Sequence, residues 1–253
     1  MISLTPLFSG SSGNCTLVES ATGAVLVDAG VSGRRIETAL EEKGKSMQSV
    51  SAILITHEHN DHILSAGTLS RKYHLPVYAS RGTWETMHST IGTVYTIRSF
   101  TEGVRFALAG MEVEAFSLPH DAAEPVGYNF YADTQKITVA TDIGKMDEGL
   151  FLYLAGSDTI LLESNYDTKM LQNGRYPYSL KQRIAGEYGH LSNGEAAAIC
   201  ARLVSLGTKR IILGHLSAEN NTPSLAYAAA KEQIEACGVH VDTDMQLAVA
   251  ARG

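Results

Sequence analysis

Three histidines and an aspartate lie within six positions of the sequence, in the run HEHNDH at residues 57–62. Imidazole nitrogen and carboxylate oxygen are the ligands that borderline divalent metals such as zinc prefer. Alternate residues of a tight loop point the same way, so we expect His57 and His59 to bind one metal. Asp61 and His62 begin a predicted helix and face a second metal. The alternative, a solvated polar turn, explains this density of histidine poorly.

A two-metal site needs further ligands, and three isolated residues are candidates. Each follows a predicted strand, at a place where a rigid scaffold can direct a side chain into a shared cleft. The candidates are His120, Asp142 and His215, which follow the predicted strands Glu112–Leu118, Ile137–Thr141 and Arg210–Gly214. Taken singly, each is an ordinary loop histidine or capping aspartate. Together with the run at 57–62 they predict a dinuclear metal site, in which a carboxylate at Asp142 bridges the two ions.

The elements that must position these residues follow from the pattern of apolar residues. The buried strand Ile53–Thr56 leads directly into the run, and a helix is predicted over residues 62–73. Residues 192–195 form a capping box that opens a helix ending at Leu206, and Thr222 with Pro223 begins a last helix. Many strands with interspersed helices favour an α/β fold in which two sheets pack face to face, with helices outside. We expect a single domain over residues 1–253.

Composition limits the classes of protein to which the chain can belong. Hydrophobic residues make up 44% of the 253 residues and charged residues 19%, which is typical of a globular protein. No stretch approaches the roughly 20 apolar residues of a membrane-spanning helix, and the N-terminus lacks the basic and apolar regions of a signal peptide. Cys15, Cys200 and Cys237 lie far apart, which favours reduced thiols and a cytoplasmic protein. The net charge of −7 means that contacts to nucleic acid must come from a local basic patch or from the metals.

The HxHxDH run, followed by an isolated histidine, aspartate and histidine, resembles the metallo-β-lactamase superfamily from Asp28 to His215. The resemblance implies an αββα sandwich of two mixed β-sheets flanked by helices. It also implies which residues bind each metal: His57, His59 and His120 the first, Asp61, His62 and His215 the second, with Asp142 as the bridge. The β-lactamases of this fold carry cysteine where Asp142 stands, and flavodiiron proteins carry glutamate where His59 stands. Thioesterases of the glyoxalase II type share all seven ligands and stay open as an alternative.

Three other segments favour phosphodiester chemistry. The loop at residues 9–14 offers backbone N–H groups and the side chains of Ser12 and Asn14 to an anion, although a plain hairpin loop has the same composition. His190, in the sequence GHLS, resembles the histidine of tRNA 3′-processing ribonucleases that protonates the leaving oxygen; Leu191 interrupts the match, and the alternative is an ordinary histidine. Residues 175–183 combine three basic residues, Lys181 among them, with two tyrosines, as in a surface that binds a nucleic-acid strand or in a solvated helix face.

Several strings, among them SGSSGNC, HDAAEPVGY and HLSAENNTP, resemble the bacterial YycJ/WalJ branch of the superfamily. This resemblance implies a 5′-to-3′ exonuclease on double-stranded DNA, linked to mismatch repair, with two zinc or manganese ions or, alternatively, iron. We expect Asp61 and His190 to act in catalysis. The expected substrate contacts are Ser12, Asn14, Lys181 and Asn220.

Two alternatives to a nuclease stay open. One is a small-molecule hydrolase acting on a thioester or lactone, and the other is a non-catalytic protein stabilised by metal. Three residues also have two interpretations each. Asn220 either contacts substrate or caps the last helix, and Glu163 and Asp167 are either partners of ligand histidines or simple loop residues.

Overall fold

A computed structural model describes residues 1–252 of the 253, and the chain divides into two compact units. The first unit contains residues 1–117, 122–135 and 251–252, and the second contains residues 118–121 and 136–250. The strands form two mixed β-sheets, and helices accompany both, as the sequence predicts. The single domain expected from the sequence stays a prediction.

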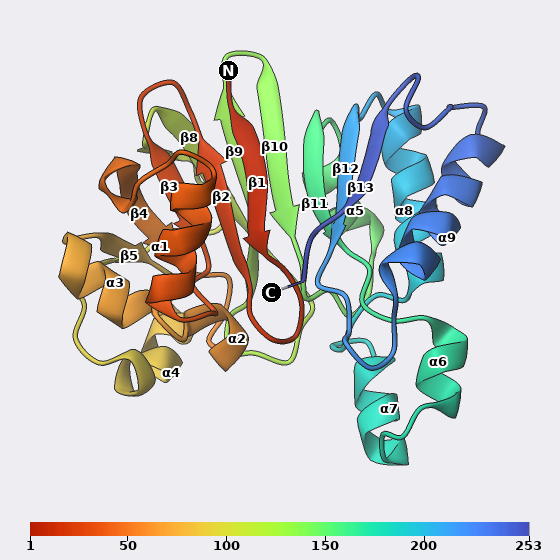
Figure 1. Ribbon diagram of the computed structural model, residues 1–253, viewed down its shortest axis with the longest axis horizontal. Helices are drawn as coiled ribbons and strands as arrows, with labels where there is room; N and C mark the ends of the chain where they lie inside the picture. Colours follow the sequence, from red (N-terminus) through yellow and green to blue (C-terminus); the bar gives the residue numbers. More distant parts are fainter. Residues whose placement is uncertain (253) are drawn as a thin grey trace. The chain divides into compact units, whose positions relative to one another are not determined.

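The first unit holds a six-stranded sheet with the order β1-β2-β3-β4-β5-β6 and an antiparallel meander of β7, β8 and β9 (Figure 1). In the six-stranded sheet, β1, β2 and β3 pair antiparallel, and β3 to β6 pair parallel. The strands of this unit are β1 Ser3–Phe8, β2 Cys15–Glu19, β3 Ala24–Val27, β4 Val50–Leu54, β5 Pro76–Tyr78, β6 Thr96–Arg98, β7 Phe106–Leu108, β8 Met111–Ser117 and β9 Val126–Ala132. Its helices are α1 Gly33–Glu42, the 3-10 turn Met47–Ser49, α2 Asn60–Ile63, α3 Ala66–Tyr73 and α4 Arg81–Ile91.

The core of the first unit explains why its central strands are apolar along their whole length. Leu26 of β3, Ile53 of β4 and Val77 of β5 are fully buried in one cluster with side chains of the neighbouring helices. Ile36 and Leu40, four positions apart on α1, contribute to that cluster because they lie on one face of the helix. Because these parallel strands are buried, their carboxyl ends are held in fixed positions.

The second unit contains a parallel sheet, β10-β11-β12-β13, with α8 and α9 packed beside it (Figure 1). Its strands are β10 Gln135–Ala140, β11 Thr159–Glu163, β12 Arg210–Gly214 and β13 Gln246–Val249, and its helices are α5 Glu148–Leu154, α6 Thr168–Asn173, α7 Tyr178–Ile184, α8 Asn193–Ser205 and α9 Pro223–Ala236. The predicted capping box is present: the Ser192 hydroxyl accepts from the Glu195 amide while the Glu195 carboxylate accepts from the Ser192 amide. The Thr222 cap of α9, with Pro223 in its first turn, is also confirmed.

One prediction about helices is wrong, and one helix was not predicted. The single helix over residues 62–73 is broken into α2 and α3, because Ser65 leaves the helical path and donates from its amide and its hydroxyl to the Ala29 carbonyl. The short helix α6 was not predicted, since six residues are too few to show helical periodicity. Among residues 1–252, no helix is both long and apolar enough to cross a lipid bilayer.

Candidate metal centre

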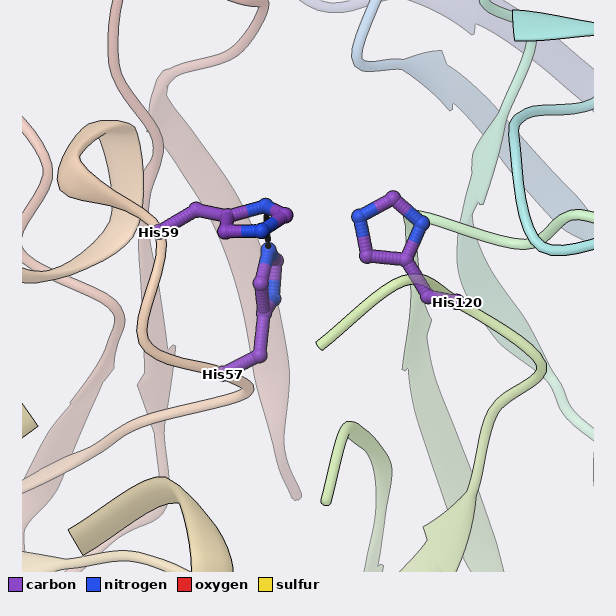
Figure 2. A group of neighbouring side chains, drawn as sticks. All are labelled: His57, His59 and His120. Carbon is purple, nitrogen blue, oxygen red and sulfur yellow. Dashed lines mark hydrogen bonds between the residues drawn. The ribbon is translucent and has the colours of Figure 1, made fainter. Parts of the chain in front are cut away.

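His57 and His59 lie in the loop that follows β4. Their ring nitrogens His57 Nε2 and His59 Nδ1 are 3.1 Å apart. Figure 2 marks this contact with a dashed line. The other nitrogen of the first ring, His57 Nδ1, lies 3.0 Å from the Thr56 hydroxyl, which accepts a hydrogen bond from it. Two nitrogens bound to one ion at about 2.0–2.1 Å lie roughly 3.0–3.4 Å from each other. The spacing of the two rings therefore fits a pair of ligands to one metal.

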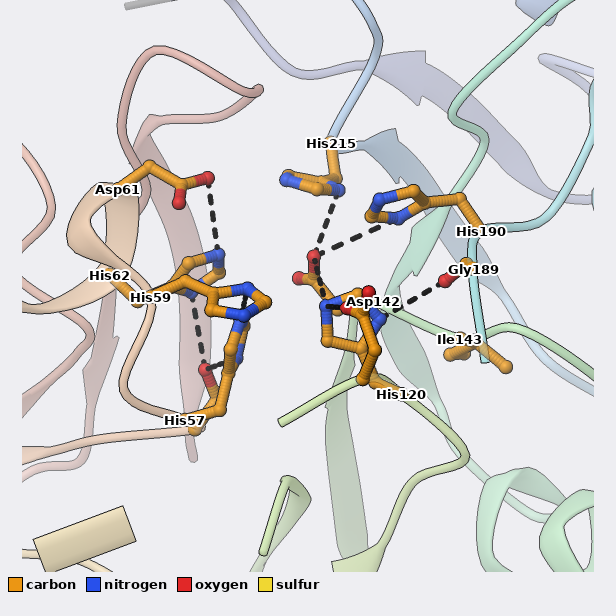
Figure 3. Close-up of polar contacts among 12 residues, drawn as sticks. His57, His59, Asp61, His62, His120, Asp142, Ile143, Gly189, His190 and His215 are labelled. Atoms are coloured by element: carbon orange, nitrogen blue, oxygen red, sulfur yellow. Dashed lines mark hydrogen bonds and ion pairs between the residues drawn. The ribbon is translucent and has the colours of Figure 1, made fainter. Parts of the chain in front are cut away.

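Asp28 at the end of β3 fixes the ring of His62. His62 Nδ1 donates to Asp28 Oδ2 at 2.8 Å, which leaves Nε2 as the ligand atom of a fully buried ring (Figure 3). The other carboxylate oxygen, Asp28 Oδ1, accepts from the Thr56 amide at 2.9 Å. Asp61 Oδ2 lies 3.5 Å from His62 Nε2, so Asp61 and His62 offer an oxygen and a nitrogen to one position, as predicted.

Asn14, from the loop at residues 9–14, is buried against the metal-binding run. Its amide donates to the Asp61 carbonyl at 2.8 Å, and its side-chain Nδ2 lies 3.1 Å from His62 Nε2. Gly30 is required at this contact, since a Cβ there would lie 1.6 Å from the Asp61 carbonyl oxygen. The loop therefore supports the ligands, and it is more than a plain hairpin loop. Ser12 lies exposed in the same loop.

A second cluster lies in the second unit, where His120, Asp142 and His215 come together. Asp142 Oδ1 is 3.4 Å from His215 Nδ1 and 3.8 Å from His120 Nε2. All three side chains are buried. The predicted position of each at the end of a strand is confirmed for Asp142 after β10 and for His215 after β12, which pair with β11 on either side.

Glu163, the last residue of β11, organises this cluster. Its Oε1 accepts from His190 Nδ1 at 2.8 Å and from His215 Nδ1 at 2.9 Å, and its Oε2 accepts from the amides of Ile143 and Leu191 (Figure 3). Burial alone would raise the pKa of this carboxyl, but the histidine charges and hydrogen bonds outweigh it and lower the pKa well below the ordinary value. Glu163 is therefore ionised, and it holds His215 with Nε2 as the ligand atom.

His120 is fixed in the same way by a backbone group. His120 Nδ1 donates to the Gly189 carbonyl at 3.0 Å, which leaves Nε2 directed toward Asp142. Burial lowers the pKa of His120, although the Asp142 charge opposes the shift. A neutral imidazole is the form that binds metal.

His190 differs from the ligand histidines because a fifth of its side chain is exposed. Its ring lies 5.1 Å from that of His120 and 5.3 Å from that of His215, between centroids. Its amide donates to the Ile184 carbonyl at the end of α7. The predicted catalytic histidine thus adjoins the predicted ligands of its own unit.

Three residues of the two clusters have left-handed backbones. The φ angles are 64° at Asp28, 65° at Asp142 and 53° at His215. Non-glycine residues in this region are uncommon and are concentrated at functional sites. The Asn165 side chain stabilises one of these turns by donating to the His215 carbonyl at 2.8 Å.

Two of the predicted substrate contacts, Lys181 and Asn220, lie near α6 and α7. The Lys181 ammonium donates to the Gln172 carbonyl at 2.7 Å. Asn220 is buried, its carbonyl accepts from the Asp167 amide, and its side-chain Nδ2 has no hydrogen-bond partner among the described residues. Thr222, not Asn220, caps α9.

The donors present in both units fit a divalent metal. The described side chains supply imidazole nitrogens, on rings fixed by partners at their other nitrogen, together with aspartate oxygens. This is the donor chemistry of zinc, manganese and iron sites.

A family model described as the β-lactamase superfamily domain matches residues 24–216, which include every predicted metal ligand. The chain belongs to the metallo-β-lactamase superfamily. Exodeoxyribonuclease YycJ of Bacillus anthracis is 40% identical over 237 residues, covering 93% of this chain and 90% of that protein. Exodeoxyribonuclease WalJ of Streptococcus pneumoniae serotype 2 is 37% identical over 245 residues, covering 95% and 91%. The crystal structure of the metallo-β-lactamase fold protein YhfI from Bacillus subtilis matches with a TM-score of 0.76 at 15% identity, over 100% of this chain and 97% of that one.

The superfamily membership confirms the resemblance stated from the sequence, and these matches confirm the predicted fold class. Of the two interpretations of Glu163, the structure supports the histidine partner, since its Oε1 accepts from His215 Nδ1. No functional role was predicted for Asp28, which holds the ring of His62. Asp167, considered beside Glu163, caps α6 by accepting from the Met170 amide. The signal shared by Asp28 and Glu163 is a carboxylate at the carboxyl end of an apolar strand, as at the predicted bridging ligand.

Proposed function

We propose that this protein is a metal-dependent exodeoxyribonuclease that degrades double-stranded DNA from the 5′ end and serves DNA repair in the cytoplasm. The observation that carries this proposal is the 40% identity to exodeoxyribonuclease YycJ over nearly the whole of both chains. The ordered donor clusters support it, because an idle site would not need its histidines fixed by partners. All three cysteines are free thiols, in keeping with a reducing compartment.

Two divalent metals, zinc or manganese with iron as an alternative, are part of the proposal. The proposed ligands of the first are His57, His59 and His120, those of the second are Asp61, His62 and His215, and Asp142 is shared. When bound, such metals polarise the phosphate and lower the pKa of water toward about 7. The nitrogen and oxygen donor atoms of the clusters in each unit support this assignment of ligands.

His190 is the proposed proton donor to the leaving ribose oxygen. Glu163 accepts from Nδ1 and so fixes the orientation of the ring. Nε2 is then the ring atom from which a proton would be donated, on a side chain that is partly open to solvent. Glu163 thus acts as a positioning residue for His190.

Two of the four proposed substrate contacts are accessible to solvent, and the other two are buried. Ser12 and Lys181 are accessible and are proposed to contact phosphates. Asn14 and Asn220 are buried, and the contacts of Asn14 with Asp61 and His62 favour a positioning role beside any contact with substrate.

The test is nucleotide release from duplex DNA labelled at the 5′ end, with manganese and zinc compared. We expect His62→Ala to abolish release and His190→Ala to lower the rate about 10²- to 10⁴-fold with metal retained. His88→Ala is the matched control, since His88 is exposed on α4 and bonds only to the Glu85 carbonyl. Hydrolysis of thioesters or lactones by a protein inert on DNA would overturn the proposal in favour of a small-molecule hydrolase.

A further inference from the structure

Helices α6 and α7 of the second unit lie next to each other (Figure 1). Side chains of both helices line a cavity of about 320 Å³. The α7 side is lined by Tyr178, Lys181 and Ala185, which are three and four positions apart and therefore lie on one helix face. The α6 side is lined by Thr168 and Leu171 at the same spacing. Both helices thus present a continuous face to this cavity, whose volume lies at the lower end of the range for small-molecule sites.

The cavity combines a buried apolar floor with an exposed aromatic rim. Leu171 and Tyr166 are 3% and 6% exposed, whereas the Tyr178 ring is 76% exposed. No residue of α7 is fully buried, so core packing does not account for the side chains on this helix. A buried apolar floor beside an open aromatic ring suits a planar ring such as a nucleobase.

Among the described residues, Lys181 is the one charged side chain that lines the cavity, although the chain carries a net charge of −7. Its ammonium donates to the Gln172 carbonyl, and among residues 1–252 no carboxylate forms an ion pair with Lys181, with Lys169 of α6 or with Arg175 between the two helices. A cation without an acidic partner in the lining, with two more on the segments that bring α6 and α7 together, complements a polyanion better than an acidic or neutral partner.

The other face of α7 leads to the catalytic cluster of the same unit. The Ile184 carbonyl at the end of the helix accepts from the His190 amide at 2.8 Å. Arg183 donates to Asp121, whose Oδ1 lies 3.4 Å from His120 Nε2. One short helix therefore contacts the histidine cluster on one side and lines the cavity on the other.

We propose that the cavity between α6 and α7 binds one unpaired nucleobase of the DNA strand being degraded. The base stacks on Tyr178, and a flanking phosphate pairs with Lys181. This inference rests on the proposed function, because it takes DNA as the substrate, and it adds where the strand is held.

The experiment measures equilibrium binding of labelled duplex DNA with a single-stranded 5′ extension, in chelator so that no cleavage occurs. One base at a time is replaced by an abasic site. We expect the parent to lose about 5- to 150-fold in affinity at one position, the range for a single base stacked on an aromatic ring. Tyr178→Ala loses a similar factor on intact DNA and is insensitive to the abasic site at that position.

Lys181→Gln is expected to reduce the salt dependence of binding by about 0.7–0.9 in slope, and Lys181→Arg to restore it. Tyr95→Ala, with a 56% exposed ring in the first unit, and Lys231→Gln on α9 are matched controls that should bind as the parent does. Unchanged melting temperatures show that the variants are folded.

Two results overturn the inference. In the first, no position of the abasic site lowers the affinity of the parent for DNA. In the second, the abasic site that weakens binding by the parent also weakens binding by Tyr178→Ala. Nucleotide release by the parent, measured in parallel, separates the two proposals. If the parent releases nucleotides but the abasic scan shows no sensitive position, the nucleobase subsite is refuted and the nuclease proposal is retained. Absence of release from every DNA, with metal present, refutes the nuclease itself and with it the subsite.

Discussion

Replacing Glu163 by glutamine exchanges one carboxylate oxygen for an NH₂ group in the centre of the second unit. The consequences follow from the hydrogen bonds that the carboxylate accepts. All four groups around this carboxylate are N–H donors: two histidine rings and the amides of Ile143 and Leu191. Both carboxylate oxygens must therefore accept. Glutamine offers one accepting oxygen and one NH₂ group, so two of the four donors face another donor.

The new amide can turn its NH₂ group in either direction, and both directions are unfavourable. Toward the backbone amides, it leaves buried donors unsatisfied, at about 1–3 kcal/mol. Toward the histidines, it favours the tautomer of His215 that accepts at Nδ1 and carries the proton on Nε2, the proposed ligand atom. We therefore expect Glu163→Gln to weaken metal binding about 10- to 100-fold. We also expect it to lower the free energy of unfolding of the metal-free protein by about 1–3 kcal/mol.

The effect on stability also depends on pH with a definite sign. The pKa of Glu163 is lowered from its ordinary 4.5, so the stability that the carboxylate contributes is present above pH 4.5 and is lost as pH falls below it. The difference in unfolding free energy between parent and variant should therefore shrink below about pH 4.5. Urea unfolding in chelator at several pH values measures it, and competition with a chromogenic chelator measures metal affinity.

The control is Glu148→Gln on α5, where an exposed carboxylate pairs with Arg202. An exposed pair contributes about 0–1 kcal/mol, so this variant should bind metal as the parent does. If Glu163→Gln matched this control in both metal affinity and unfolding free energy, the reasoning about tautomers and unsatisfied donors would be wrong.

Two further predictions concern the first unit. Gly30→Ala should displace the loop at Asp61, since the added Cβ would lie 1.6 Å from its carbonyl oxygen; we expect about 1–3 kcal/mol or more of destabilisation in urea unfolding and weaker metal binding. Gly194→Ala, whose Cβ would meet only a hydroxyl at 3.9 Å, is the control, and equal losses in both would contradict the steric argument. Burial and a hydrogen bond to Glu114 raise the pKa of Tyr131 to about 12, so stability should fall as pH rises from about 10 to 12. Glu114→Gln should lower that pKa in an ultraviolet titration of the tyrosines, and an unchanged titration would exclude the contribution of Glu114.

The metal-binding run and the strand-end residues could be predicted from the sequence because ligand-type residues lie close together in the run or directly follow predicted strands. Histidine is scarce, so three within residues 57–62 indicate a site before any fold is known. Local density does not identify the supporting carboxylates, since Glu163 keeps two interpretations in the sequence and no such role is predicted for Asp28. Asp28 and Glu163 are two of 27 acidic residues, and what distinguishes them is a hydrogen bond to a histidine 34 or 52 positions away in sequence.

The break between α2 and α3 was missed for a related reason. Helical periodicity continues through Ser65 over residues 62–73, and no glycine or proline marks the interruption at that residue. The helix ends because Ser65 bonds to the Ala29 carbonyl, a group brought there by β3. Periodicity within a segment contains no information about a partner supplied by another strand.

The left-handed turns at Asp28 and Asp142 have a consequence for which variants of this protein can be recovered. Aspartate and asparagine tolerate this backbone conformation better than alanine or β-branched residues do. Asparagine at either position removes the charge and keeps the turn, whereas alanine removes the charge and also disfavours the turn. At Asp28, asparagine would leave either the Thr56 amide or His62 Nδ1 facing an NH₂ group. At Asp142, a substitution library should divide by expression level, with asparagine and glycine among the well-folded members. Loss of folding and loss of chemistry can be separated there by the choice of replacement alone.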